Sequence, residues 1–140
     1  MDQEELAFAE LHELVESLPP DRVAEAGYFE EGWSAKDLLA HIGSWLAEAG
    51  AVMERIRFGT YRPDEIQIDE MNASFYEAMK DVSYPTVRSQ TRAARSRMLN
   101  AWGALGSDPP EAERWIRKAG FEHYQEHLPR LREWLAETEA

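Results

Sequence analysis

Apolar residues recur every three or four positions along each long segment of this chain, and no stretch alternates convincingly with a period of two. Such spacing places the apolar side chains on one face of an α-helix, whereas a half-buried strand needs strict alternation. Prolines and glycines interrupt the pattern and mark the turns between segments. We therefore predict an all-α protein, with helices over the ranges 3–18, 34–58, 66–80, 85–105 and 111–137.

Local signals mark the ends of several of these helices. Ser34 followed three residues later by Asp37 is the pattern of a capping box, which predicts that the second helix opens at Ser34. Two prolines at 19–20 end the first helix. The segment GSDPPE at 106–111 indicates the end of one helix and the beginning of the next, with prolines in the first turn of the last helix.

Amphipathic helices of this length bury their apolar faces best when they pack against one another as a bundle. The 140 residues suffice for one hydrophobic core, so we expect residues 1–140 to form a single four-helix-bundle domain. Segments 20–30 and 59–65 are irregular, and we expect one of them to cross an end of the bundle.

Composition and charge exclude several classes of function. The chain contains no cysteine, which excludes disulfides, zinc–thiolate sites and a thiol nucleophile carried by the protein, so any thiol would have to come with a cofactor. The formal net charge of −12 repels phosphate backbones, and we expect no nucleic-acid partner. Basic residues gather between Arg88 and Arg97, and we interpret this cluster as the solvated face of one helix.

The sequence also bears on the compartment of the protein. No apolar run approaches the ~18 residues that a membrane span needs, so we expect no membrane association. The opening segment MDQEELAFAE is acidic and lacks the basic-then-apolar layout of a signal peptide. We therefore expect a cytoplasmic protein.

Three of the four histidines fall on apolar helix faces. His123 and His127 are four residues apart, so their side chains point the same way from one helix, one turn apart. His41 lies on the apolar face of the second helix, and a facing helix can supply it as a third ligand to a metal in the bundle core. His12 lies beside the apolar face of the first helix, and we interpret it as a surface residue.

Two explanations of the three core histidines remain open on spacing alone. A buried imidazole is commonly a core residue satisfied by neighbouring polar groups, but a pair is harder to satisfy in this way. The alternative is a metal site, and three imidazoles without a fourth protein ligand would leave open coordination positions, as in catalytic centres. All-imidazole ligation suits zinc, nickel, iron or copper, and we expect zinc or nickel.

The segment HYQEH at 123–127 also matches the H-x-x-E-H pattern of inverzincin proteases, in which the glutamate is the general base. Those proteases are large and take a further carboxylate ligand from well downstream. Only 13 residues follow His127 in this sequence. We therefore favour a solvated position for Glu126, beside the apolar face of its helix.

Three further residues are predicted to line a ligand pocket: Trp45, Asn72 and Tyr76. Asn72 is the other polar residue on an apolar helix face. The simpler interpretation is that Asn72 is a buried amide that forms a hydrogen bond to a neighbouring helix. The functional interpretation is that Asn72 lines the pocket or orients a substrate. No catalytic residue is identified beyond the candidate metal ligands.

Three segments carry a resemblance to a known superfamily. GWSAKDLLAHIGSW, at 32–45, resembles the tryptophan–serine entry and first metal histidine of the DinB/YfiT-like superfamily. GFEHYQEHLPRLREWL, at 120–135, resembles its last helix, which carries a histidine pair. IDEMNASFYEAMKDVS, at 68–83, looks like the third helix of the ClbS/DfsB branch. The resemblance covers nearly the whole chain, from residue 5 to residue 137.

The resemblance implies an up-down-down-up four-helix bundle and a divalent-metal site carried here by His41, His123 and His127. Members with known activity include isomerases and transferases that depend on a thiol cofactor, and hydrolases that protect against reactive compounds. It thus implies a metal-dependent transferase or hydrolase that acts on a small electrophilic molecule with a low-molecular-weight thiol, and a homodimer. The alternatives are a non-catalytic bundle that binds a small molecule for self-protection and a structural dimer with a vestigial site.

Overall fold

The computed structural model of the protein describes residues 2–26, 32–63 and 67–139. Every regular element in these ranges is an α-helix, so the expected all-α class is confirmed. The helices are α1 (Asp2–Ser17), α2 (Pro20–Val23), α3 (Ala35–Arg57), α4 (Ile68–Met79), α5 (Tyr84–Gly103), α6 (Pro110–Ala119) and α7 (Phe121–Glu139). Among them, none is long and apolar enough to cross a membrane.

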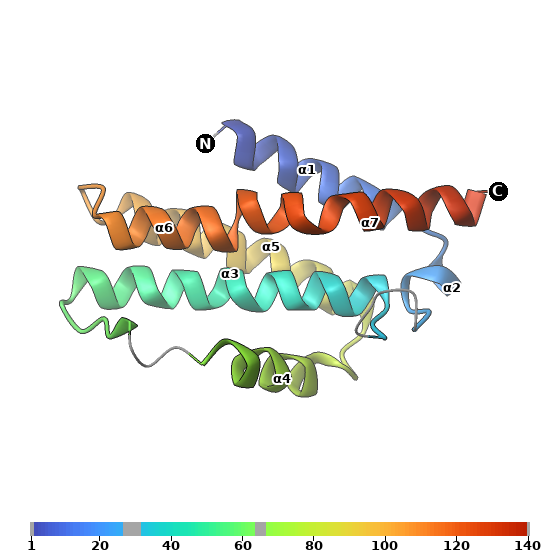
Figure 1. The fold of residues 1–140 in the computed structure, drawn as a ribbon, viewed down its shortest axis with the longest axis horizontal. Coiled ribbons are helices and arrows are strands. Elements are labelled where there is room, and N and C mark those ends of the chain that lie inside the picture. Colours follow the sequence, from blue (N-terminus) through green and yellow to red (C-terminus); the bar gives the residue numbers. More distant parts are fainter. Residues whose placement is uncertain (1, 27–31, 64–66, 140) are drawn as a thin grey trace.

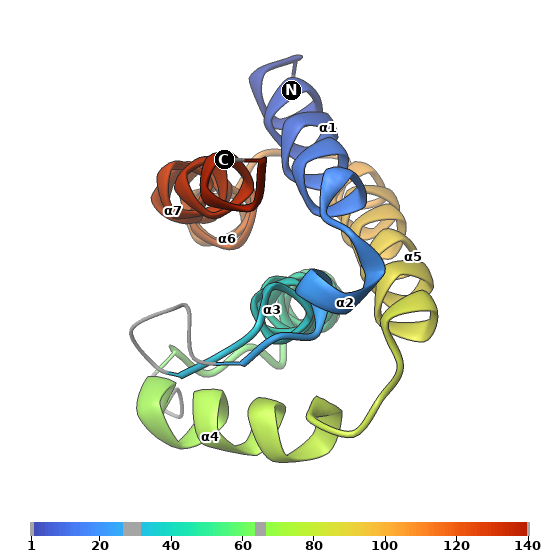
Figure 2. The same cartoon turned by 90° about the vertical axis from the view of Figure 1, so that its right-hand side faces the viewer.

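The bundle in the described part of the chain consists of α1, α3, α5 and the consecutive pair α6–α7. The chain colours in Figure 1 show that α1 and the α6–α7 pair run one way, whereas α3 and α5 run the opposite way. This is the expected up-down-down-up arrangement. The shorter helix α4 lies within the crossover between the parallel helices α3 and α5, and it packs on the outer side of α3 (Figure 2).

α3 is the central helix of the molecule, because it packs against α4, α5 and α6. Its capping box forms as predicted: the Ser34 hydroxyl accepts the Asp37 N–H at 3.0 Å, and the Asp37 carboxylate accepts the Ser34 N–H at 3.0 Å. α3 and α5 approach each other closely at Gly43, where a Cβ atom would collide with the Thr91 hydroxyl. Glycine at this position therefore sets the separation of the two helices.

The last predicted helix, 111–137, is not continuous. It breaks at Gly120, whose backbone angles of φ −98° and ψ −109° end α6 before α7 begins at Phe121. A Cβ atom at Gly120 would lie 2.6 Å from the carbonyl oxygen of Ile116, so glycine permits a turn that other residues would obstruct. The break lets α6 pack mainly on α3 while α7 packs mainly on α1.

The basic cluster at 88–97 is only in part a solvated face, which corrects the sequence-based interpretation: Arg92 and Arg97 are exposed, whereas Arg95 is partly buried. Several of its arginines instead face acidic or polar residues of α1. Arg88 contacts Glu16 at 2.9 Å, and Arg95 forms two hydrogen bonds to the buried Glu4, at 2.6 and 2.8 Å. The cluster therefore joins α5 to the first helix of the bundle.

His12 lies in the same seam between α1 and α5, so its predicted surface position also holds only in part. Its side chain is only 16% exposed, and its Nε2 atom lies 2.6 Å from Arg92. Burial and then the Arg92 charge lower the pKa of His12. Pairing between helices, which the sequence of one helix does not reveal, explains both corrections.

One of the two irregular segments lies at an end of the bundle. The short helix α2 follows α1 and sits beside the start of α3, at the end of the bundle that faces the viewer in Figure 2. The predicted start of the third helix at residue 66 lies outside the described residues, and α4 is described from Ile68.

Candidate metal centre

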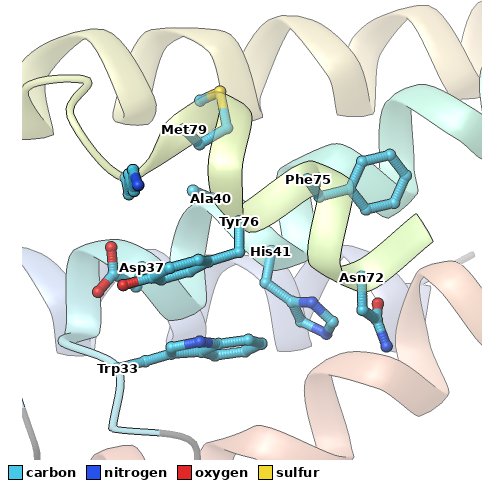
Figure 3. A pocket seen from close by; sticks show the side chains of 9 residues that line it. Trp33, Asp37, Ala40, His41, Asn72, Phe75, Tyr76 and Met79 are labelled. Carbon is cyan, nitrogen blue, oxygen red and sulfur yellow. The ribbon is translucent and has the colours of Figure 1, made fainter. Parts of the chain in front are cut away.

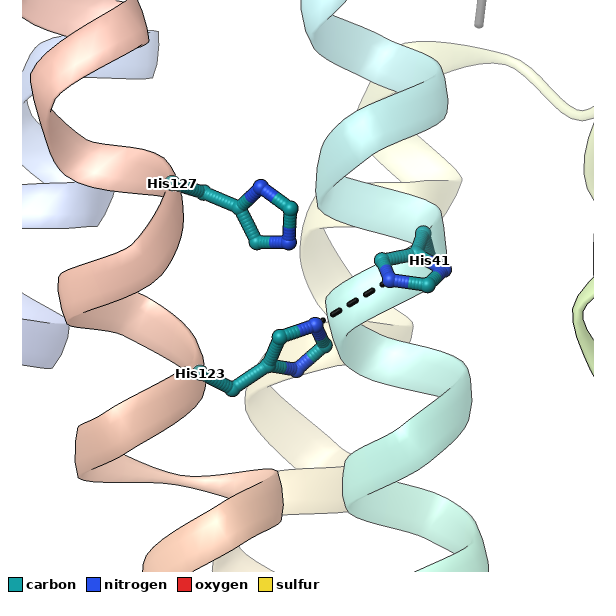
Figure 4. Close-up of side chains that lie close together, drawn as sticks. All are labelled: His41, His123 and His127. Atoms are coloured by element: carbon teal, nitrogen blue, oxygen red, sulfur yellow. Dashed lines mark hydrogen bonds between the residues drawn. The ribbon is translucent and has the colours of Figure 1, made fainter. Parts of the chain in front are cut away.

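The three core histidines come together between α3 and α7. His41 projects from α3, whereas His123 and His127 project from successive turns of α7 (Figure 4). Their candidate ligand nitrogens all lie within 4.8 Å of one another, and the Nε2 atoms of His41 and His123 are 3.1 Å apart. Residues 82 positions apart in the chain thus share one point in the bundle core.

Local structure explains how each ring reaches this point. The capping box fixes where α3 begins, and His41 follows two turns later on the same face as the buried Leu38. On α7, the i, i+4 spacing places the other two rings 4.9 Å apart, centroid to centroid. The ring of His41 meets both of them nearly edge-on, at interplanar angles of 74° and 90°.

Burial keeps two of the imidazoles neutral at physiological pH. Desolvation, and then the proximity of His127, lowers the pKa of His41 to about 4. Desolvation, followed by the neighbouring His41 and His127, lowers the pKa of His123 to about 3. A neutral imidazole presents one lone pair, which is the form that binds a metal.

The residues present fit a divalent metal. Imidazole–metal bonds of about 2.0–2.1 Å in tetrahedral geometry place ligand nitrogens roughly 3.3 Å apart, close to the His41–His123 separation. The Nδ1 atom of His41 is buried and meets no hydrogen-bond partner among the described residues, so the ring is incompletely satisfied by protein alone. Within those residues the cluster holds three histidines and no carboxylate, which leaves coordination positions for another molecule.

A narrow crevice between α3 and α4 leads to His41 (Figure 3). Its walls are aromatic or apolar with a few polar groups, and they consist of Trp33, Asp37, Ala40, His41, Asn72, Phe75, Tyr76, Met79 and Lys80. Of the predicted pocket residues, Asn72 and Tyr76 line this crevice. Trp45 does not line it but lies behind Asn72, to whose Oδ1 atom its indole N–H donates a hydrogen bond of 2.7 Å.

Trp33 lines the crevice although it was not predicted to do so. Its ring lies 4.9 Å from that of His41 and stacks nearly parallel to Tyr76 at 6.1 Å. Phe75 and Met79 were also missed, although they share a helix face with Asn72, and this spacing was the available signal. For Trp33 the signal was its place in the tryptophan–serine entry before α3, but no helical register fixes its side chain there.

Glu126 is exposed, as predicted for a solvated position. Its side chain is 70% accessible, and its carboxylate lies 3.9 Å from His127 Nε2, on the solvent side of α7. The protein core contains a different glutamate, Glu4, which accepts hydrogen bonds from Arg95 and from the buried Tyr124 hydroxyl at 3.0 Å. This network was not predicted, because its members come from three separate helices.

Comparisons with known proteins agree with the fold. The sequence profile of a family described as "Mycothiol maleylpyruvate isomerase N-terminal domain" matches residues 5–139. No curated protein matches the chain. Among solved structures, the crystal structure of an uncharacterised protein from Escherichia coli UTI89 is similar with a TM-score of 0.81 at 15% identity, covering 98% of this chain and 91% of that chain. This second likeness concerns the fold alone.

Proposed function

The chain belongs to the mycothiol maleylpyruvate isomerase N-terminal domain family, and from that premise we propose that it is a metal-dependent protein that acts on a small electrophilic molecule together with a low-molecular-weight thiol. The family lies within the DinB/YfiT-like superfamily, so the resemblance noted in the sequence is confirmed. Its name points to the isomerase branch, whereas one segment of the chain looks like the ClbS/DfsB branch. Transferase and hydrolase chemistry are both compatible with the proposal.

In this proposal His41, His123 and His127 hold the metal, which we expect to be zinc or nickel. A bound metal would supply a deprotonated thiol or water at neutral pH, because a divalent ion lowers the pKa of its ligands. The protein's own contribution is to keep the imidazoles neutral by burial, to orient them from two helices, and to hold the second molecule in the crevice beside His41.

One observation supports this function above the others. Three imidazoles that are distant in the sequence converge in a largely apolar core, beside a crevice. Burying the His41 ring without full hydrogen bonding is costly, so the arrangement is hard to explain by core packing alone. Three ligands without a carboxylate also leave room for a thiol and a substrate.

A second candidate function is non-catalytic binding of a small molecule. It is favoured by the absence of a separate general base in the cluster formed by the described residues. Asp37 lines the crevice, but its carboxylate already accepts the Ser34 N–H in the helix cap. Turnover of a reactive electrophile with added thiol would support an enzymatic function. Stoichiometric binding without turnover would support non-catalytic binding.

Metal analysis of untagged protein tests the proposal directly. After reconstitution with zinc or nickel and removal of excess ion, we expect about one equivalent of metal per chain, and less than roughly a tenth of an equivalent would contradict the proposal. His127→Ala should lose most of this metal, because two imidazoles remain. His12→Ala is the matched control, since it removes a histidine of the α1–α5 seam and should leave the metal content unchanged.

A further inference from the structure

The side-chain amide of Asn72 has a defined orientation. The indole N–H of Trp45 can only donate, and it lies 2.7 Å from Asn72 Oδ1, so the amide oxygen faces Trp45. The NH2 group of Asn72 therefore faces away from this bond. Among the described residues no acceptor lies within hydrogen-bond distance of that NH2 group. A donor on the wall of the crevice is thus left for another molecule.

Trp45 is itself held in place by its neighbours. Its ring meets Phe75 edge-on at 5.2 Å and lies 6.1 Å from the ring of Trp115. Trp115 in turn donates its indole N–H to the Tyr61 hydroxyl at 2.8 Å. This chain of contacts links α3, α4 and α6, and it keeps the amide of Asn72 from reversing.

The crevice that receives this donor is suited to a flat, apolar body. Trp33 and Tyr76 have planes only 10° apart, and Phe75 and Met79 complete the apolar part of the wall. Aromatic rings of this kind pack well against flat unsaturated molecules. The donor of Asn72 adds one polar requirement, because a molecule without an acceptor would leave that donor unpaired.

The cations at the crevice are paired with carboxylates and offer little to an anion. The Lys36 ammonium lies 3.9 Å from the carboxylate of Asp37, and the Lys80 ammonium lies 2.9 Å from Glu77. The whole chain carries a net charge of −12, which also repels anions. The acceptor that pairs with Asn72 is therefore better supplied by a neutral carbonyl than by a carboxylate.

We propose that Asn72 is a substrate-binding residue that donates a hydrogen bond to a carbonyl oxygen, and that the crevice takes an uncharged, flat carbonyl compound beside His41. This inference rests on the proposed function, since it takes the histidine cluster as the reacting centre. It specifies the electrophile as an uncharged, flat carbonyl compound.

Entry of such a molecule requires α4 to move away from α3, because the crevice is narrow. This motion exposes little core, since α4 contributes no fully buried side chain. The turn after α4 is anchored separately: Lys36 donates to the carbonyl oxygens of Lys80 and Val82, at 2.7 and 2.9 Å. Tilting of α4 about this anchored end would widen the crevice.

Three small probes test the inference on metal-free protein: acetophenone, its isostere α-methylstyrene, which lacks the oxygen, and the anion benzoate. Dissociation constants are measured by ligand-observed NMR titration. One net hydrogen bond predicts that acetophenone binds roughly 3- to 10-fold more tightly than α-methylstyrene, with benzoate the weakest. Equal binding of the two neutral probes, or tightest binding of benzoate, would overturn the inference.

Variants assign the preference to Asn72. Asn72→Leu removes the donor, and Asn72→Asp keeps an acceptor for Trp45 but also removes the donor, so both should abolish the preference for acetophenone. Trp45→Phe should reduce it, because the amide is then free to rotate. Ser74→Ala changes an exposed residue of the same helix and should leave all three constants unchanged. A preference that survives in both Asn72 variants would refute the assignment.

The outcome is separable from that of the metal analysis, because the probes bind metal-free protein. A chain that holds one metal ion but shows no preference between the neutral probes would refute the inference and leave the proposed function standing. Conversely, a preference for acetophenone in a chain that takes up no metal would refute the proposed function alone.

Discussion

At positions 41 and 123, the packing around each ring sets the protonation state of the histidine. Both rings lie among apolar side chains of α3 and α7, and desolvation outweighs the other influences on their pKa values. His12, in the α1–α5 seam, shows a lowered pKa for a partly different reason, since the Arg92 charge adds to burial. The pKa values of three histidines of one chain are thus lowered by two kinds of surroundings.

The metal-free protein should lose stability as the pH falls below that at which histidines in the unfolded chain take up protons. Unfolded histidines are protonated near the ordinary pKa of about 6.5, whereas the folded protein keeps His41 and His123 neutral down to about pH 4 and about pH 3. The unfolded state therefore binds more protons in this window. Each histidine lowers the free energy of unfolding by at most about 1.4 kcal/mol per pH unit.

Urea unfolding followed by circular dichroism, at several pH values between about 7 and 5, measures this slope. The double variant His41→Gln, His123→Gln retains polar side chains that do not titrate, and its slope should be flatter than that of the unsubstituted protein. Identical slopes for the two proteins would contradict the pKa values that burial imposes.

Among the elements, the α6–α7 junction shows how one glycine redirects a helix. The apolar spacing continues across Gly120 without interruption, so periodicity alone predicts a single helix. The backbone angles of Gly120, φ −98° and ψ −109°, are what break it. As a result α6 packs against α3, and the two histidines of α7 lie close to His41.

Gly120→Ala should destabilise the protein by roughly 1–3 kcal/mol, because the added Cβ atom would meet a backbone carbonyl that has little freedom to move. Thermal and urea unfolding measure the effect. Gly103→Ala is the matched control: a Cβ there meets no atom within 4 Å, so the change should be neutral or stabilise by up to about 1 kcal/mol. A Gly120 variant as stable as the control variant would show that the junction does not require glycine.

The whole molecule is tied together by a buried polar network as well as by its apolar core. Glu4 of α1 accepts hydrogen bonds from Arg95 of α5 and from Tyr124 of α7, and the Arg95 guanidinium also lies 4.7 Å from the ring of Phe8. Tyr124 directly follows the candidate ligand His123, so the network fixes the turn of α7 from which that ligand projects.

Glu4→Ala should lower the free energy of unfolding by roughly 3 kcal/mol, because it leaves the partly buried Arg95 without its counter-charge. Tyr124→Phe should lower it by about 1 kcal/mol, the net value of one hydrogen bond. Glu5→Ala, at the exposed neighbouring position, should change it by less than about 0.5 kcal/mol. Equal stability of the Glu4 and Glu5 variants in urea titrations would contradict a stabilising role for the network.

Features that depend on neighbours along the chain were readable from the sequence. The helices at 34–58 and 85–105 correspond closely to α3 and α5, and the capping box at Ser34 forms as expected. The i, i+4 spacing of His123 and His127 placed both rings on one side of α7. These features were accessible because helical periodicity and caps involve residues only a few positions apart.

Only the tertiary structure decided which helix faces meet. It brought His41 to the α7 pair, paired Arg88 and Arg95 of α5 with glutamates of α1, and placed Asn72 against Trp45. It also decided the break at Gly120, which depends on the backbone angles of that residue rather than on the apolar pattern. An amphipathic sequence specifies which side of a helix is buried but not its partner, because many pairings bury similar apolar area and the close contacts between side chains select among them.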